Sequence, residues 1–184
     1  MKINFIKMTL LTLISLLLIS GCGKEENKPV AINEKTDKCE ICHMAVKDNQ
    51  FSTEIILEKG KSIVFDDIGC MYKWMEENKD QQIASSFVKD YQTKEWIDPE
   101  KASFVYDKPI KTPMAYNVIA FSDKKNAESF INKNGGTLLT YDKLSDHSWE
   151  RNEDMVKEMK EKMMQMKMNG GKEGMDMEHS EDSH

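Results

Sequence analysis

Residues 38 to 44, Lys-Cys-Glu-Ile-Cys-His-Met, place two thiols and one thioether within six positions. Thiolate and thioether sulfurs are soft donors, which favour Cu(I) over harder cations. Cys42 and Met44 are two positions apart, so an extended backbone would point both side chains the same way. Cys39 can approach Cys42 in a turn, and His43 adds an imidazole, although a single loop histidine is more often solvated. The spacing therefore predicts a site for a soft metal ion.

Other chemistries use the same residue types. A structural zinc site usually has four ligands, and no second spaced pair of cysteines is present. A thioredoxin-like redox pair would open a helix after a strand, whereas Cys39 and Cys42 follow a polar stretch. A structural disulfide between Cys39 and Cys42 is the simplest remaining alternative. It would leave Cys70 as an odd thiol.

The chain begins with a pattern typical of secretion. Two lysines precede an apolar run from Met8 to Ile19, and Ser20 and Gly21 then lead into Cys22. A cysteine at this point resembles the bacterial lipobox, which implies that residues 1–21 are removed and that Cys22 is lipidated. Residues 22–37 are polar and predict a tether. We expect an extracytoplasmic protein that is lipid-anchored to the bacterial membrane; an uncleaved anchor with an incidental cysteine is the alternative.

Composition excludes several classes of function. The 184 residues are 39% hydrophobic with a formal net charge of −6, which suits one domain or two very small ones. No long block of lysine and arginine indicates a nucleic-acid partner. No Ser-His-Asp order, phosphate loop or paired-carboxylate motif stands out, so a hydrolase or nucleotide enzyme is not expected.

The elements that position the cysteines recur along the chain. The pattern predicts strand, strand, helix, strand, and then the same order again. This is an α+β fold of two packed ββαβ units, 38–98 and 99–142, because each half alone buries too little apolar surface. Asp66 and Asp67 are expected to cap the first helix, and Ser122 or Asp123 the second. The expected strands lie within 50–67, 83–91, 102–107, 115–122 and 137–142, and the helices within 68–78 and 124–134.

The C-terminal part has a different composition. Residues 143–169 predict a Met-rich helix, and 170–184 predict a disordered Met/His-rich tail. Eight of the 14 methionines lie between residues 155 and 177. Met155, Met159, Met163 and Met166 can share one helical face, which core packing also explains. The additional candidate copper ligands in the tail are Met175, Met177, His179 and His184.

Several of these stretches together resemble the NosL family of copper-binding lipoproteins, the nitrous-oxide reductase accessory proteins. They are "CEICHMAV", "IVFDDIGCMYKWM", "TPMAYNVIAF" and a late Gly-Gly, and they span roughly residues 37–141. The family's C-x-x-C-G-M is matched except that His43 replaces the glycine, and its Pro-Met is matched by Pro113 and Met114. The resemblance implies an organomercury-lyase-like fold, Cu(I) binding and delivery of copper to nitrous-oxide reductase.

The expected mechanism is ligand exchange and not bond-making catalysis. Cys42 and Met44 are the first two expected ligands, Met114 could close the site from the second unit, and Cys39 could be a ligand or a redox partner. Cys70 and His43 are further candidates. Two alternatives stay open: a thiol-disulfide oxidoreductase or lyase that uses Cys39 and Cys42, and a structural surface lipoprotein with one disulfide.

Overall fold

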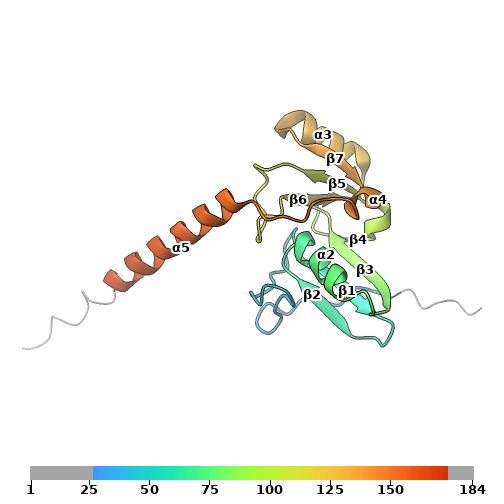
Figure 1. Cartoon of the computed structure of the whole chain (residues 1–184), viewed down its shortest axis with the longest axis horizontal. Helices are drawn as coiled ribbons and strands as arrows, with labels where there is room; N and C mark the ends of the chain where they lie inside the picture. The colour runs from blue at the N-terminus through green and yellow to red at the C-terminus, as the bar shows by residue number, and fades with distance from the viewer. Residues whose placement is uncertain (1–26, 174–184) are drawn as a thin grey trace, which may run out of the picture.

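The computed structural model describes residues 27–173, and it has the expected α+β architecture. Two small antiparallel sheets, each with a helix packed on it, lie one beside the other, and a long C-terminal helix extends away from them (Figure 1). Cys22 and the tail residues Met175, Met177, His179 and His184 lie outside the described residues. Within residues 27–173, no helix is both long and apolar enough to cross a bilayer.

The first unit is a four-stranded sheet with one covering helix. Its strands run in the order β2-β1-β3-β4, and every pairing is antiparallel. Gly60 at φ +80° makes the turn between the first two strands, a conformation that glycine adopts without a Cβ penalty. The elements are β1 (Thr53–Leu57), β2 (Ser62–Phe65), α2 (Ile68–Glu77), β3 (Ile83–Lys89) and β4 (Trp96–Ile97).

The second unit repeats this topology. A short 3₁₀ helix, η2 (Pro99–Lys101), leads into a sheet with the order β6-β5-β7, again fully antiparallel. In both units the first strand is central and the strand after the helix pairs on its other side, which confirms the strand-strand-helix-strand order. The elements are β5 (Ser103–Tyr106), β6 (Val118–Phe121), α3 (Lys124–Asn134) and β7 (Thr137–Thr140).

The helix ends follow their sequence signals. Asp67 caps α2 by accepting from the Gly69 N–H at 3.0 Å, and Asp123 caps α3 by accepting from the Lys125 N–H at 2.7 Å. Gly135 at φ +87° ends α3. Asp67 is therefore the cap among the two aspartates that precede α2.

The two units share one hydrophobic core and a buried polar contact. The main cluster contains Phe65 and Trp74 from the first unit and Phe104 from the second. Asp90, at the end of β3, is buried and accepts from the Ser122 N–H at 2.7 Å and from its hydroxyl at 2.8 Å. We call this contact the Asp90 clasp. It joins the end of β3 to the end of β6 and confirms that the units pack on each other.

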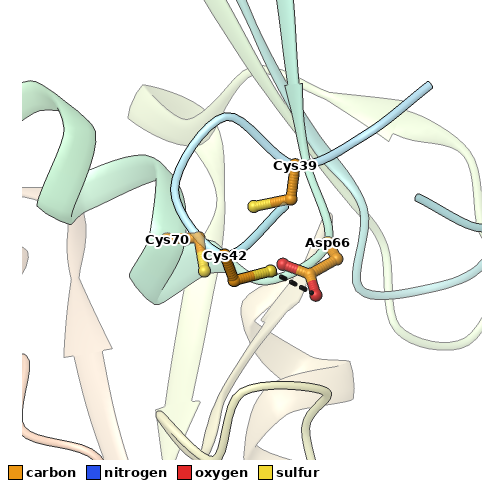
Figure 2. A group of neighbouring side chains, drawn as sticks. All are labelled: Cys39, Cys42, Asp66 and Cys70. Carbon is orange, nitrogen blue, oxygen red and sulfur yellow. Dashed lines mark hydrogen bonds between the residues drawn. The ribbon is translucent and has the colours of Figure 1, made fainter. Parts of the chain in front are cut away.

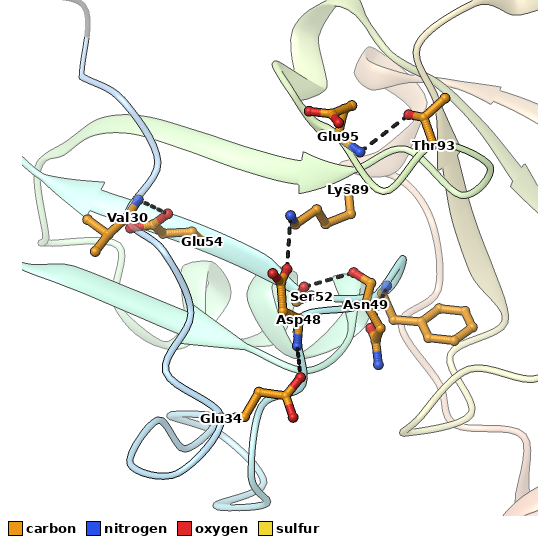
Figure 3. Close-up of polar contacts among 10 residues, drawn as sticks. Val30, Glu34, Asp48, Asn49, Ser52, Glu54, Lys89, Thr93 and Glu95 are labelled. Atoms are coloured by element: carbon orange, nitrogen blue, oxygen red, sulfur yellow. Dashed lines mark hydrogen bonds and ion pairs between the residues drawn. The ribbon is translucent and has the colours of Figure 1, made fainter.

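Polar contacts hold the segment before the first sheet (Figure 3). The buried carboxylate of Glu54 accepts from the Val30 N–H at 2.9 Å. Lys89 pairs with Asp48 at 3.0 Å and lies over the Trp96 ring at 4.2 Å. These contacts fix the path of the chain on both sides of the loop that carries Cys39 and Cys42.

The C-terminal region differs in detail from the single helix expected over 143–169. It forms a short helix α4 (Tyr141–Leu144) and the long helix α5 (Glu153–Glu173), with a non-helical link between them. Trp149 in this link stacks on Tyr72 at 4.5 Å, and its indole N–H donates to the Leu144 carbonyl at 3.1 Å. Packing of this indole against α2 takes precedence over local helix propensity. The helix α5 then continues through both glycines at 170 and 171.

Candidate metal centre

Four side chains from three separate segments meet at one point beside the first sheet. The sulfur atoms of Cys39, Cys42 and Cys70 and a carboxylate oxygen of Asp66 all lie within 4.8 Å of one another. Figure 2 shows the four side chains turned toward a common centre, two from the N-terminal loop, one from the end of β2 and one from α2. We call this group the cysteine cluster. Its three cysteines are free thiols.

The loop that carries Cys39 and Cys42 is held by its own backbone. The Cys39 N–H donates to the Met44 carbonyl and the His43 N–H donates to the Cys39 carbonyl, each at 2.9 Å. This closes a tight turn that brings the sulfurs of Cys39 and Cys42 together. His43 has φ +61°, a left-handed conformation that suits glycine. Glycine stands at this position in the family pattern, so His43 keeps the local backbone geometry that the pattern implies.

The other two members follow from the start of α2. Cys70 lies in the first turn of the helix and is fully buried. Asp66 precedes the capping residue, and its carboxylate accepts a hydrogen bond from the Cys42 thiol at 3.2 Å. Its other carboxylate oxygen, Oδ1, is buried and has no hydrogen-bond partner among the described residues. A buried acceptor without a donor is costly, and either a proton or a metal cation at this carboxylate would relieve that cost.

Electrostatics distribute the thiol protons unevenly. Hydrogen bonding with Cys42 and Cys70 lowers the pKa of Cys39. Hydrogen bonding to Cys39 is also the main cause that raises the pKa of Cys42 to about 12, and it raises the pKa of Cys70. Burial, followed by the charge of Cys39, raises the pKa of Asp66 to about 7. The three thiols and the Asp66 carboxyl therefore share their protons as one group, because the ionisation of each opposes that of its neighbours.

Three further predicted ligands, Met44, His43 and Met114, are not members of the cysteine cluster. Met44 follows it on the loop with its side chain 49% exposed, and His43 is exposed. Met114 is half-buried against the main core, and its backbone N–H donates to the Asp67 carboxylate at 2.9 Å. The structure therefore places Met114 beside the cap of α2, across the junction between the units.

Sequence reasoning did not assign Asp66 to this group. It treated both aspartates as caps, and it left the role of Cys70 open. The adjacency of Asp66 and Asp67 at the end of the strand could have indicated the role of Asp66. When one of two adjacent side chains points toward the start of the helix, the other points in a different direction. Three sulfurs and one oxygen make a soft donor set that suits a thiophilic metal ion, with the carboxylate as its hardest member.

Comparison with known proteins agrees with this fold. The family model described as NosL matches residues 29–149, which is more than half of the chain and contains both units and the cysteine cluster. The crystal structure of the copper chaperone NosL from Shewanella denitrificans matches with a TM-score of 0.56 at 23% identity, covering 62% of this chain and 93% of that one. No curated protein matches the chain. By the extent of the family match, this protein is a member of the NosL family.

Proposed function

We propose that this protein binds one Cu(I) ion at the cysteine cluster and passes it to a copper enzyme by ligand exchange. The observation that carries the proposal is the convergence of three free thiols within 4.8 Å of one another. Membership of the NosL family and the copper chaperone name of the Shewanella protein support the same choice of metal.

The donor chemistry supports Cu(I) specifically. Thiolates prefer Cu(I) among the ions that a bacterium handles outside the cytoplasm, and low coordination by two or three sulfurs satisfies that ion. Zinc would need the Asp66 carboxylate as a fourth ligand beside the three sulfurs, whereas Cu(I) needs the sulfurs alone, and membership of the NosL family favours copper. We assign Cys39, Cys42 and Cys70 as the ligands and Asp66 as the group that orients the Cys42 thiol.

Burial suggests how the ion enters and leaves. Cys39 and Cys70 are fully buried, whereas Cys42 is half-buried and stands next to the exposed Met44. An incoming ligand can therefore reach the ion on the Cys42 side, where Met44 supplies a weak neutral donor during the exchange. Met114, whose backbone N–H is bonded to the Asp67 carboxylate, is the candidate donor from the second unit. The exchange makes and breaks bonds to the metal and releases or takes up thiol protons, and no substrate bond is made or broken, so the protein acts as a chaperone and not as an enzyme.

The setting of this activity is part of the proposal. The lipobox-like ending at Cys22 supports lipid attachment on the outer side of a bacterial membrane. The family resemblance supports nitrous-oxide reductase as the recipient. Replacement of Cys22 by serine should leave an unprocessed or soluble protein, which mass spectrometry of the mature N-terminus would detect. An unmodified Cys22 in the membrane fraction would contradict the anchor.

Competition with a Cu(I) chelator of known affinity, without oxygen, tests metal binding. We expect Cys42→Ser to weaken binding by more than ~100-fold, equivalent to about 2.7 kcal/mol, because an anionic ligand is lost. Met44→Leu, which keeps the apolar volume and removes the sulfur, should cost less. Cys70→Ser should also weaken binding, since its sulfur lies in the cluster. Wild-type affinity in Cys42→Ser, or a strict preference for Zn(II), would overturn the proposal.

Thiol–disulfide exchange is the second candidate, favoured by the lowered pKa of Cys39. The thiolate form is the nucleophile in such reactions. Cys39 is nevertheless fully buried, which keeps its sulfur from an incoming disulfide. Turnover of a disulfide substrate by metal-free protein, lost in Cys39→Ser, would favour this candidate over copper binding.

A further inference from the structure

The helix α5 carries a set of methionines that the packing of the protein does not use. It extends away from both sheets over most of its length (Figure 1). The exposed fractions of Met163, Met164 and Met166 are 51%, 64% and 71%. Core packing therefore does not account for these three side chains, whereas Met159 is half-buried and lines a cavity together with Phe51 and Pro113.

The spacing groups most of these methionines on one face. At about 100° per residue, Met155, Met159, Met163 and Met166 fall within an arc of about 80°, and Met164 points away from them. Neighbours three or four positions apart have Cβ atoms about 5–6 Å from each other. Two adjacent thioethers on this face can therefore hold one ion between them.

The N-terminal end of α5, which we call its foot, is fixed to the junction between the two units, beside the cysteine cluster. Met155 is buried, and its sulfur accepts from the Asn117 side-chain amide at 3.4 Å. The Arg151 guanidinium donates to the Met114 carbonyl at 2.8 Å, and the Met114 N–H donates to Asp67. Met114 thus lies between the foot of α5 and the cap of the helix that carries Cys70.

The choice of residue points to sulfur chemistry and not to a protein partner. From residue 157 to residue 166, methionine is the only apolar residue type on the helix. Packed helix faces draw mainly on leucine, isoleucine and valine, which have better defined rotamers. Methionine also fills gaps between packed side chains, but Met163 and Met166 are exposed, and their thioethers are soft neutral ligands for Cu(I).

We propose that Met159, Met163 and Met166 form a second, weaker Cu(I) site on α5, which captures the ion and passes it along the helix to the cysteine cluster. The inference rests on the proposed function, because the cluster is the acceptor. Within this site, Met159–Met163 and Met163–Met166 are two alternative thioether pairs for one ion, since both pairs use Met163. Neutral sulfurs bind the ion more weakly than thiolates, so the transfer runs downhill toward the cysteines. The ion keeps its oxidation state and only exchanges ligands.

The test uses the full chain with ¹³C-labelled methionine methyl groups. In wild-type protein already loaded with one equivalent of Cu(I), a second equivalent should shift the methyl signals of Met159, Met163 and Met166. In a background whose tail candidates Met175, Met177, His179 and His184 are replaced, the triple change of these residues to leucine should abolish the binding of that weaker equivalent. The change removes sulfur while keeping helix propensity and apolar volume. The single change Met164→Leu is the matched control and should leave binding intact.

A variant with Cys39, Cys42 and Cys70 replaced by serine separates this inference from the proposed function. Its α5 methyl signals should still shift with Ag(I), a redox-inert substitute for Cu(I). If the cluster fails to bind copper and these signals shift, the proposed function is wrong and the α5 site stands. If the cluster binds copper and the signals stay unchanged in both proteins, or if the leucine variant keeps the weaker equivalent, the α5 site is refuted.

Discussion

Replacement of Gly69 by alanine should disturb the junction between the two units. Gly69 lies in the first turn of α2, next to Cys70, and the ring of Tyr116 from the second unit packs directly on it. A Cβ at this position would lie 2.0 Å from the Tyr116 Cγ, whereas ordinary contacts are 3.4–4 Å. The ring would have to retreat by about 1.4 Å to restore an ordinary contact.

The expected cost follows from that overlap. Overpacking of a core typically costs ~1–3 kcal/mol, and this contact belongs at the upper end because the buried Tyr116 ring also packs edge-on against Trp149. Alanine returns up to ~1 kcal/mol of helix propensity. We therefore expect a net loss of about 2 kcal/mol in the free energy of unfolding, which lowers Tm by roughly 4–8 °C for a domain of this size.

Urea unfolding followed by tryptophan fluorescence would measure the loss. A double-mutant cycle with Tyr116→Ala assigns its cause, because removal of the ring should make Gly69→Ala nearly free of cost. Gly60→Ala is a control, since its Cβ meets nothing within 4 Å and only the φ of +80° is strained. An equal cost of Gly69→Ala in both backgrounds, or a cost below about 0.5 kcal/mol, would refute the overlap argument.

Three further changes test charges and backbone strain. Burial alone would raise the pKa of Asp90, but hydrogen bonds from Ser122 and from the backbone of residues 92–93 outweigh it, so the pKa of Asp90 is lowered. The ionised carboxylate of Asp90 therefore stabilises the fold above about pH 4, and this contribution is lost as the pH falls further. Asp90→Asn should cost ~2 kcal/mol of the free energy of unfolding at pH 7 and should reduce the fall of the urea midpoint below pH 4. An unchanged fall of the urea midpoint at acid pH would contradict this. Burial raises the pKa of Glu54, so its ionised form lowers stability as pH rises above about 4.3. Glu54→Gln should then match or exceed wild-type stability at pH 7 and lose any advantage near pH 4; a loss at pH 7 would show that the charge itself stabilises the fold. His43→Gly should stabilise the loop by ~1 kcal/mol, because glycine adopts the left-handed φ of +61° without strain, and copper affinity should be retained. A loss of copper affinity in this variant would show that the imidazole is a ligand.

The sequence predicted the elements well because each carries local signals. Strand alternation, the turn at Gly60, the caps at Asp67 and Asp123 and the stop at Gly135 are all short-range features. They were sufficient for the ββαβ order of both units.

The metal centre depends on contacts that no local pattern contains. Cys70 joins Cys39 and Cys42 only because the N-terminal loop packs over the start of α2. The burial of Asp66 depends on the same packing. The link between α4 and α5 shows the same limit, since stacking of Trp149 on Tyr72 is a tertiary contact that interrupts a helical composition.

The junction between the units also determines how the molecule opens. Asp67 holds both the helix that carries Cys70 and the backbone of Met114, and the Asp90 clasp joins the two sheets at their ends. Amide hydrogens at the centre of β1 and β5 should therefore exchange with solvent through one shared opening. Copper at 1,000 times its Kd would raise the free energy of that opening by about 4.1 kcal/mol. Protection from exchange, and from proteases, would then rise as much in the second unit, which supplies none of the cysteines, as in the first.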